Sequence, residues 1–384
     1  MGVLSPESLS CFGVSPMIEE AGDNVEKVEL TSEELEDLSS VSSDAKPISY
    51  TGQDFDVDGL IKRLIKRDIL IPTFGHDDDD IRAAGFQRAF VWRRPQMDKF
   101  IESILLGYPI PGVFLVKQFD NRYLVLDGQQ RLLTLRFFHD GIYEGKEFAL
   151  KNVADDFKGL TYKTLPDELR RQFDNTFIQA IIVTSDGTTE SLESIYRIFE
   201  RLNSGGTQLT PHEIRVALYA GSFIDFLEEL NSDGSWRELY GKKSPRLRDQ
   251  ELVLRIFGLV SNSERYKRPL KRFLNDVVAI HRDEARDDHE AFAHAFERAT
   301  HVLVETVGRD AYRTGSQVNA ALAEAVMVGL TRRLLVNLQI RKEDISGIID
   351  EIKSAARDAI SRSTADESQV MYRIEISTKL FAEI

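Results

Sequence analysis

The spacing of hydrophobic residues differs between the two halves of the chain. Three short apolar runs, Val113–Val116, Tyr123–Leu126 and Phe177–Val183, are rich in the residues that buried strands prefer. After the last two runs, apolar residues recur every three or four positions, which predicts amphipathic helices. From about Ser222 onward only this helical spacing is found. The pattern predicts strands alternating with helices first, and then a helical bundle or array.

The first 48 residues have a different composition from the rest of the chain. They are rich in Ser, Glu and Asp and contain few large apolar side chains, so they bury too little surface to offset the entropy lost on ordering. We therefore predict a disordered acidic tail. Thr31 and Glu34 have the spacing of a capping box, which would start a short transient helix. A functional alternative is that the tail shields a basic groove.

Length and composition restrict the class of protein. A chain of 384 residues with 42% hydrophobic and 29% charged residues is typical of a soluble protein with two domains. We expect it to be cytoplasmic, because it contains neither a long apolar segment nor a signal-peptide pattern. The single Cys11 argues against disulfides and redox chemistry. A net charge of -14 argues against indiscriminate nucleic-acid binding, so any DNA contact should be confined to one face.

The strongest candidate site lies where the second apolar run meets the following helix, at Asp127-Gly128-Gln129-Gln130-Arg131. Gly128 allows a sharp turn, and the first turn of the helix points its N–H groups out of the strand end, which favours anions. Arg131 adds a charged fork suited to phosphate oxygens. Asp127 is placed to orient a water, a metal or a ribose hydroxyl. The alternative is an ordinary turn with a helix N-cap.

Two further segments have residues suited to binding phosphate. Gln87 and Arg88 lie between aromatic residues just before a predicted helix. Their alternative interpretation is an ordinary surface charge pair. Glu200 and Arg201 lie near the end of another predicted helix, which is followed by Asn203 and a pair of glycines. Most loops of this kind only cap helices.

Three separated motifs together resemble the N-terminal domain family of the GmrSD restriction endonucleases. These motifs are Phe86-Gln87-Arg88-x-Phe90-x-Trp92, Leu126-Asp127-Gly128-Gln129-Gln130-Arg131-Leu132-x-Thr134 and Phe199-Glu200-Arg201-Leu202-Asn203-x-Gly205-Gly206-x-x-Leu209. The resemblance covers about residues 55 to 219, with the motifs in the expected order. It implies an α/β ParB/sulfiredoxin-like N-terminal domain, followed here by an all-α helical C-terminal domain. The cysteine that sulfiredoxins carry in the equivalent turn is missing, so sulfiredoxin activity is excluded.

The resemblance also implies a function and a set of site residues. It implies a domain that binds and hydrolyses a nucleoside triphosphate, with Mg²⁺, in a system that restricts foreign or modified DNA. Carried over by position, the catalytic residues are Asp127, Arg131 and Glu200. The nucleotide-binding residues carried over are Gln87, Arg88, Gly128, Gln129, Gln130, Arg201 and Asn203. The implied partner is DNA, and a homo-oligomer is left open.

Two other functions remain as alternatives. The sequence shows no convincing His-Asn-His nuclease motif, which favours a non-catalytic module that senses nucleotide or DNA for a separate nuclease subunit. The ParB-like resemblance suggests instead a domain that itself nicks DNA. Four histidines cluster in the second half, but they lack zinc-site spacing. We expect them to be exposed helix histidines. They are His281, His289, His294 and His301.

The predicted domain boundaries separate a tail at 1–48, a nucleotide-binding domain at 49–220 and a helical domain at 221–384. Within the helical part, basic residues gather at Lys242–Arg248 and Lys267–Arg272. Against an acidic total charge, these two clusters are the best candidates for contacts with DNA phosphates. The alternative is that they are ordinary solvated helix ends and loops.

Overall fold

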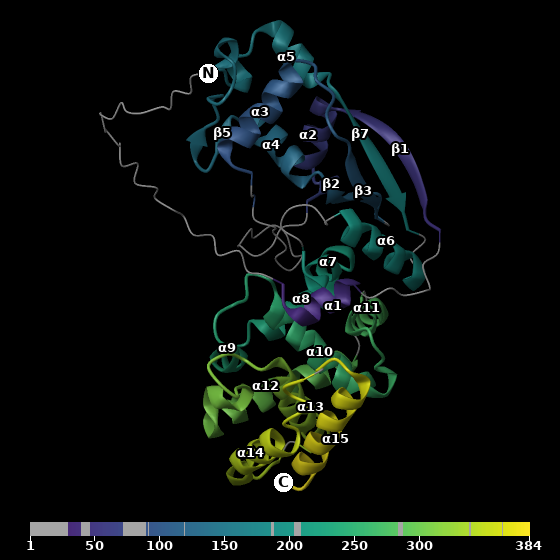
Figure 1. Ribbon diagram of the computed structural model, residues 1–384, viewed down its shortest axis with the longest axis vertical. Helices are drawn as coiled ribbons and strands as arrows, with labels where there is room; N and C mark the ends of the chain where they lie inside the picture. The colour runs from purple at the N-terminus through teal and green to yellow at the C-terminus, as the bar shows by residue number, and fades with distance from the viewer. Residues whose placement is uncertain are drawn as a thin grey trace, which may run out of the picture.

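The computed structural model describes residues 30–39, 47–71, 90, 92–118, 120–185, 188–202, 209–282, 287–337, 339–362 and 364–384. Its upper part in Figure 1 is a sheet with helices, and its lower part is helical. The sequence predicted this order of α/β first and helices afterwards, and the structure confirms it. None of the described helices is long and apolar enough to cross a membrane.

A five-stranded mixed sheet forms the first part, in the order β1-β7-β3-β4-β2. β7 and β3 are parallel, as are β4 and β2, whereas β1–β7 and β3–β4 are antiparallel pairs. The three predicted apolar runs are the central strands β3, β4 and β7, as expected. The strands are β1 (Ser49–Asp56), β2 (Ile69–Leu70), β3 (Val113–Lys117), β4 (Tyr123–Asp127) and β7 (Phe177–Thr184); β5 (Ile142–Tyr143) and β6 (Lys146–Glu147) form a separate hairpin.

Helices cover both faces of the sheet. Alternate residues of each strand point to opposite faces, so each strand packs against helices on both sides. In β4, Val125 packs into a cluster with the helices of one face, whereas Leu124 and Leu126 belong to a cluster with α6 and α7 on the other. The helices of the first face are α2 (Val57–Ile65), α3 (Arg94–Leu105), α4 (Gln129–Asp140) and α5 (Asp167–Asp174). The second face is covered by α6 (Thr189–Leu202) and α7 (Pro211–Leu218).

The hydrophobic cluster on the second face continues into the helical part of the molecule. Phe199 of α6 and Ile214 of α7 belong to the same buried cluster as Leu252 and Met327, which lie much later in the chain. The later helices are α8 (Ser222–Asn231), α9 (Gly234–Tyr240), α10 (Arg248–Asn262), α11 (Leu270–His281), α12 (Asp287–Thr306), α13 (Ala320–Val336), α14 (Ile345–Ala355) and α15 (Glu367–Ala382). The helices α6 and α7 therefore connect the sheet to the helical part.

The predicted acidic tail contains one described helix, α1 (Ser32–Ser39). Its capping box is formed as the sequence suggested: the Glu34 N–H donates to Thr31 Oγ1 at 3.2 Å, and the Thr31 N–H donates to Glu34 Oε2 at 2.6 Å. Figure 1 shows α1, in purple, beside α7 in the middle of the molecule. The prediction of disorder is therefore wrong for this short segment, because its acidic side chains find cationic partners in the helical part.

Candidate functional site

The Asp127–Arg131 turn joins β4 to α4 through a glycine in a left-handed conformation. Gly128 has a φ of +99°, which strains any residue with a Cβ atom. A Cβ built at this position would lie 2.5 Å from Val113 Cγ1 of the neighbouring strand β3. Both the backbone angle and the space next to β3 therefore require glycine, and the turn brings the start of α4 tightly against the sheet.

Asp127 and Arg131 form an ion pair across this turn. The Arg131 Nη2 donates to Asp127 Oδ2 at 2.7 Å and to the Gly112 carbonyl oxygen at 3.0 Å. The Arg131 side chain is 17% exposed and the Asp127 side chain 45% exposed. Because Arg131 holds one carboxylate oxygen while the carboxylate still reaches solvent, Asp127 is fixed in direction and remains accessible.

The first turn of α4 adds polar groups to this site. Gln129 and Gln130 occupy its first two positions, and Gln130 Oε1 accepts a hydrogen bond from the Trp92 N–H at 3.1 Å. The start of a helix presents backbone N–H groups and the positive end of its dipole, so this end of β4 favours an anion. The Gln130 contact also ties the segment before α3 to the turn.

Glu200 lies on the other face of the sheet. It belongs to α6, and its Oε1 accepts from Lys271 Nζ of α11 at 3.0 Å. Burial raises the pKa of Glu200, although Lys271 acts to lower it. In the described structure Glu200 pairs with Lys271, whereas Asp127 pairs with Arg131.

The other predicted site residues are only partly described. Arg201 is exposed near the C-terminal end of α6. Gln87, Arg88 and Asn203 lie outside the described residues, so their predicted place beside the turn stays a prediction.

The predicted exposure of the four histidines is wrong for two of them. His281 and His289 are buried at 3% and 6% exposure, and His281 Nδ1 lies 2.8 Å from His289 Nε2. Both rings pack against Phe223 and Phe257. His294 and His301 are exposed, as expected. Spacing along the chain could not reveal the buried pair, because the two histidines come from different helices.

The two basic clusters are engaged within the molecule itself. Arg246 pairs with Glu213, Arg248 with Glu34, and Lys271 with Glu200. Lys243 pairs with Glu228, and Arg268 with Asp366. Acids distant in sequence occupy the buried Arg246 and Lys271, whereas the exposed Lys243 and Arg268 fit the alternative of solvated helix ends and loops. Contacts of these clusters with DNA stay a prediction.

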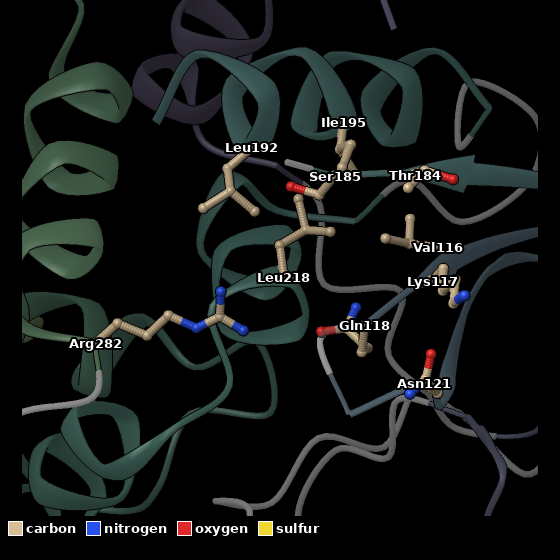
Figure 2. Close-up of a pocket in the computed structure, with 10 residues that line it drawn as sticks. All are labelled: Val116, Lys117, Gln118, Asn121, Thr184, Ser185, Leu192, Ile195, Leu218 and Arg282. Atoms are coloured by element: carbon tan, nitrogen blue, oxygen red, sulfur yellow. The ribbon is translucent and has the colours of Figure 1, made fainter. Parts of the chain in front are cut away.

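A cavity that the motifs did not indicate lies where the parallel strands β3 and β7 end. It has a volume of about 180 Å³ and an apolar floor that includes Leu192, Ile195 and Leu218. Figure 2 shows Arg282 extending from the end of α11 toward the strand end that carries Gln118. Because β4 is antiparallel to β3, this cavity and Asp127 lie at opposite ends of the sheet.

These features define a protein with an α/β domain, joined to helices, that carries an Asp–Arg pair at a strand–glycine–helix turn. Residues 70–220 match the model of the family described as GmrSD restriction endonuclease, N-terminal domain. This part of the chain is therefore similar to the N-terminal domain of this restriction-endonuclease family, as the three motifs predicted. The match runs from the end of β2 to just past α7. No curated protein matches the chain.

Proposed function

We propose that this chain is the component of a DNA restriction system that binds and hydrolyses a nucleoside triphosphate, and that the nucleotide binds at the Asp127–Arg131 turn. The geometry of Gly128 is the observation that carries the proposal. A left-handed glycine with no space for a Cβ brings the start of a helix against the strand end, as phosphate-binding turns require. The match to a restriction-endonuclease domain supports the biological setting.

The residues of the turn have separate tasks in this proposal. The N–H groups of the first turn of α4 bind phosphate oxygens, and Arg131 contributes positive charge beside them. Asp127, held by Arg131 at 2.7 Å, orients the attacking water. Phosphoryl transfer is catalysed mainly by positioning and charge stabilisation, so a fixed carboxylate and a fixed guanidinium suit it.

A magnesium ion fits the same turn. Mg²⁺ is usually held by one or two carboxylates together with substrate phosphates, and the Asp127 carboxylate is partly exposed beside the proposed phosphate position. The ion would supply neutralisation of phosphate charge. The proposal also includes the ParB/sulfiredoxin-like fold and the further site residues that the resemblance implies. These residues are Gln87, Arg88, Glu200, Arg201 and Asn203.

Phosphate release by the full chain tests the proposal, with ATP and GTP and with or without duplex DNA. Arg131→Ala should lower the rate at least about 100-fold, since it removes charge at the transferred phosphate. Arg136→Ala is the matched control: it lies on the same helix in an exposed i,i+4 pair with Asp140 and should stay within about twofold. Equal rates in Arg131→Ala and the wild type would refute hydrolysis at this turn.

The position of Glu200 favours a second candidate function. Because Lys271 engages the Glu200 carboxylate, the proposed site has Asp127 as its one described acid available to orient a water. The chain would then be a non-catalytic module that senses nucleotide or DNA and acts through a separate nuclease subunit. Calorimetry distinguishes the two functions: nucleotide binding without phosphate release, in the presence of DNA, supports the second.

A further inference from the structure

The acidic helix α1 is docked on a group of cations, most of which are buried. We call Arg215, Arg246, Arg248, Arg255 and Lys271 the cationic site; they come from α7, the segment before α10, α10 itself and α11. Arg248 donates from Nε and Nη2 to the two carboxylate oxygens of Glu34, at 2.9 and 2.8 Å. Arg255 Nη1 donates to Glu33 Oε1 at 2.8 Å. These pairs join residues more than 200 positions apart in the sequence.

Charge, more than apolar burial, holds α1 in place among its described side chains. Glu34 and Asp37 are 7% and 8% exposed, whereas Leu35 is 52% exposed. A helix of eight residues is too short to be stable alone in water. Contacts between charges also weaken as salt or competing ions are added, unlike apolar contacts. The docking of α1 is therefore open to competition by another anion.

Part of the acidic face of α1 is buried at a cost. Burial raises the pKa of Asp37 to about 6, against the lowering effect of Arg255 and Arg215. Burial also raises the pKa of Glu33, although Arg255 acts to lower it. The docking of α1 therefore depends chiefly on the two hydrogen bonds between Glu34 and Arg248, whereas Asp37 is buried at a cost once it ionises.

Most cations of the site also have acidic partners in their own part of the chain. Glu213 pairs with Arg246, Glu251 with Arg215 and Arg255, and Glu200 with Lys271. Glu34 and Glu33 of α1 pair with Arg248 and Arg255. If α1 leaves, Arg248 and Arg255 lose these two carboxylates, and a phosphate can take the same position on an arginine.

We propose that α1 is an internal competitor for nucleic acid: Arg248 and Arg255, the two cations that pair with Glu34 and Glu33, bind the phosphodiester backbone of DNA when α1 leaves. The fork of an arginine pairs with a carboxylate and a phosphate through the same two parallel hydrogen bonds. Glu34 therefore occupies a phosphate position on Arg248. The remainder of this acidic chain repels DNA, which confines binding to such a site. The proposal does not depend on nucleotide hydrolysis at the Asp127–Arg131 turn.

Charge reversal in α1 tests this proposal with the full chain and a labelled DNA duplex of about 20 base pairs at low salt. Glu34→Lys should undock α1 and tighten DNA binding at least about tenfold, because the internal competitor is lost. Glu147→Lys, at an exposed acid of β6, is the matched control with the same change in net charge and should gain less than about threefold. Adding Arg248→Gln to Glu34→Lys should abolish the gain.

Each outcome either supports or overturns the proposal that α1 competes with DNA. Equal gains in Glu34→Lys and Glu147→Lys, or a gain that survives Arg248→Gln, would overturn the proposal. If Glu34→Lys does not fold, hydrogen exchange of the wild type decides instead. Saturating DNA should then speed exchange of the α1 amides at least about tenfold; unchanged or slower exchange in α1 would overturn it. Nucleotide hydrolysis is assayed separately, so a failure here leaves that proposal standing.

Discussion

Replacing Gly128 by alanine should destabilise the protein by an amount that the structure allows us to estimate. The left-handed φ of +99° costs an alanine about 1–2 kcal/mol relative to glycine. The new methyl group would also lie 2.5 Å from Val113 Cγ1, and relieving such overpacking costs about 1–3 kcal/mol. We therefore expect Gly128→Ala to lower the free energy of unfolding by about 2–5 kcal/mol.

Gly141→Ala separates the two contributions, because Gly141 ends the same helix with a φ of +77° and has nothing within 4 Å of a built Cβ. Urea unfolding, followed by circular dichroism, should show a loss of only about 1–2 kcal/mol for this control. A loss in Gly128→Ala no greater than that in Gly141→Ala would refute the close approach of α4 to β3. The added methyl would also lie 3.2 Å from Arg131 Nη2, so phosphate release should fall together with stability.

Two further predictions concern buried charges. Lys271→Met leaves the Glu200 carboxylate buried without its cation and should cost about 3 kcal/mol in urea unfolding; adding Glu200→Gln should recover part of the loss, and no recovery would contradict the pairing. Asp37→Asn should stabilise the protein at pH 7.5 by up to about 3 kcal/mol and have little effect near pH 4. The sign of this effect follows from the pKa of Asp37, which is raised from 3.8 to about 6. Such a carboxyl stabilises the folded state at low pH and loses that contribution as pH rises. A variant less stable than the wild type at pH 7.5 would show instead that Asp37 is a favourable ion-pair partner.

Features that depend on neighbours in sequence were predictable. The Asp127–Arg131 pair has i,i+4 spacing across a strand–glycine–helix turn, and Thr31 and Glu34 form a capping box at i,i+3. The short apolar runs also identified the three central strands. In each case the deciding contact lies within a few residues, so the residue types and their spacing determine the geometry.

Features that depend on the tertiary fold were not predictable from the same patterns. His281 and His289 belong to different helices that meet only in the packed structure, so their spacing said nothing about their burial. Glu200 follows the motif of the family, yet its pairing with Lys271 appears only when α6 and α11 are packed together. Residue type and order do not report which distant helices meet.

The basic clusters show most clearly why charge in a sequence is hard to interpret. Arg248 and Lys271 lie in the two most basic segments of the chain, which suggested contacts with DNA. Their partners in the structure are Glu34 and Glu200, which lie 214 and 71 residues away. A cation becomes available to DNA only if the acid that the fold places beside it can leave. Lys271 is 3% exposed and held by Glu200 within the core, whereas Glu34 lies on a short helix held by charge. Of these two cations, Arg248 is therefore the one through which the fold permits an exchange of carboxylate for phosphate.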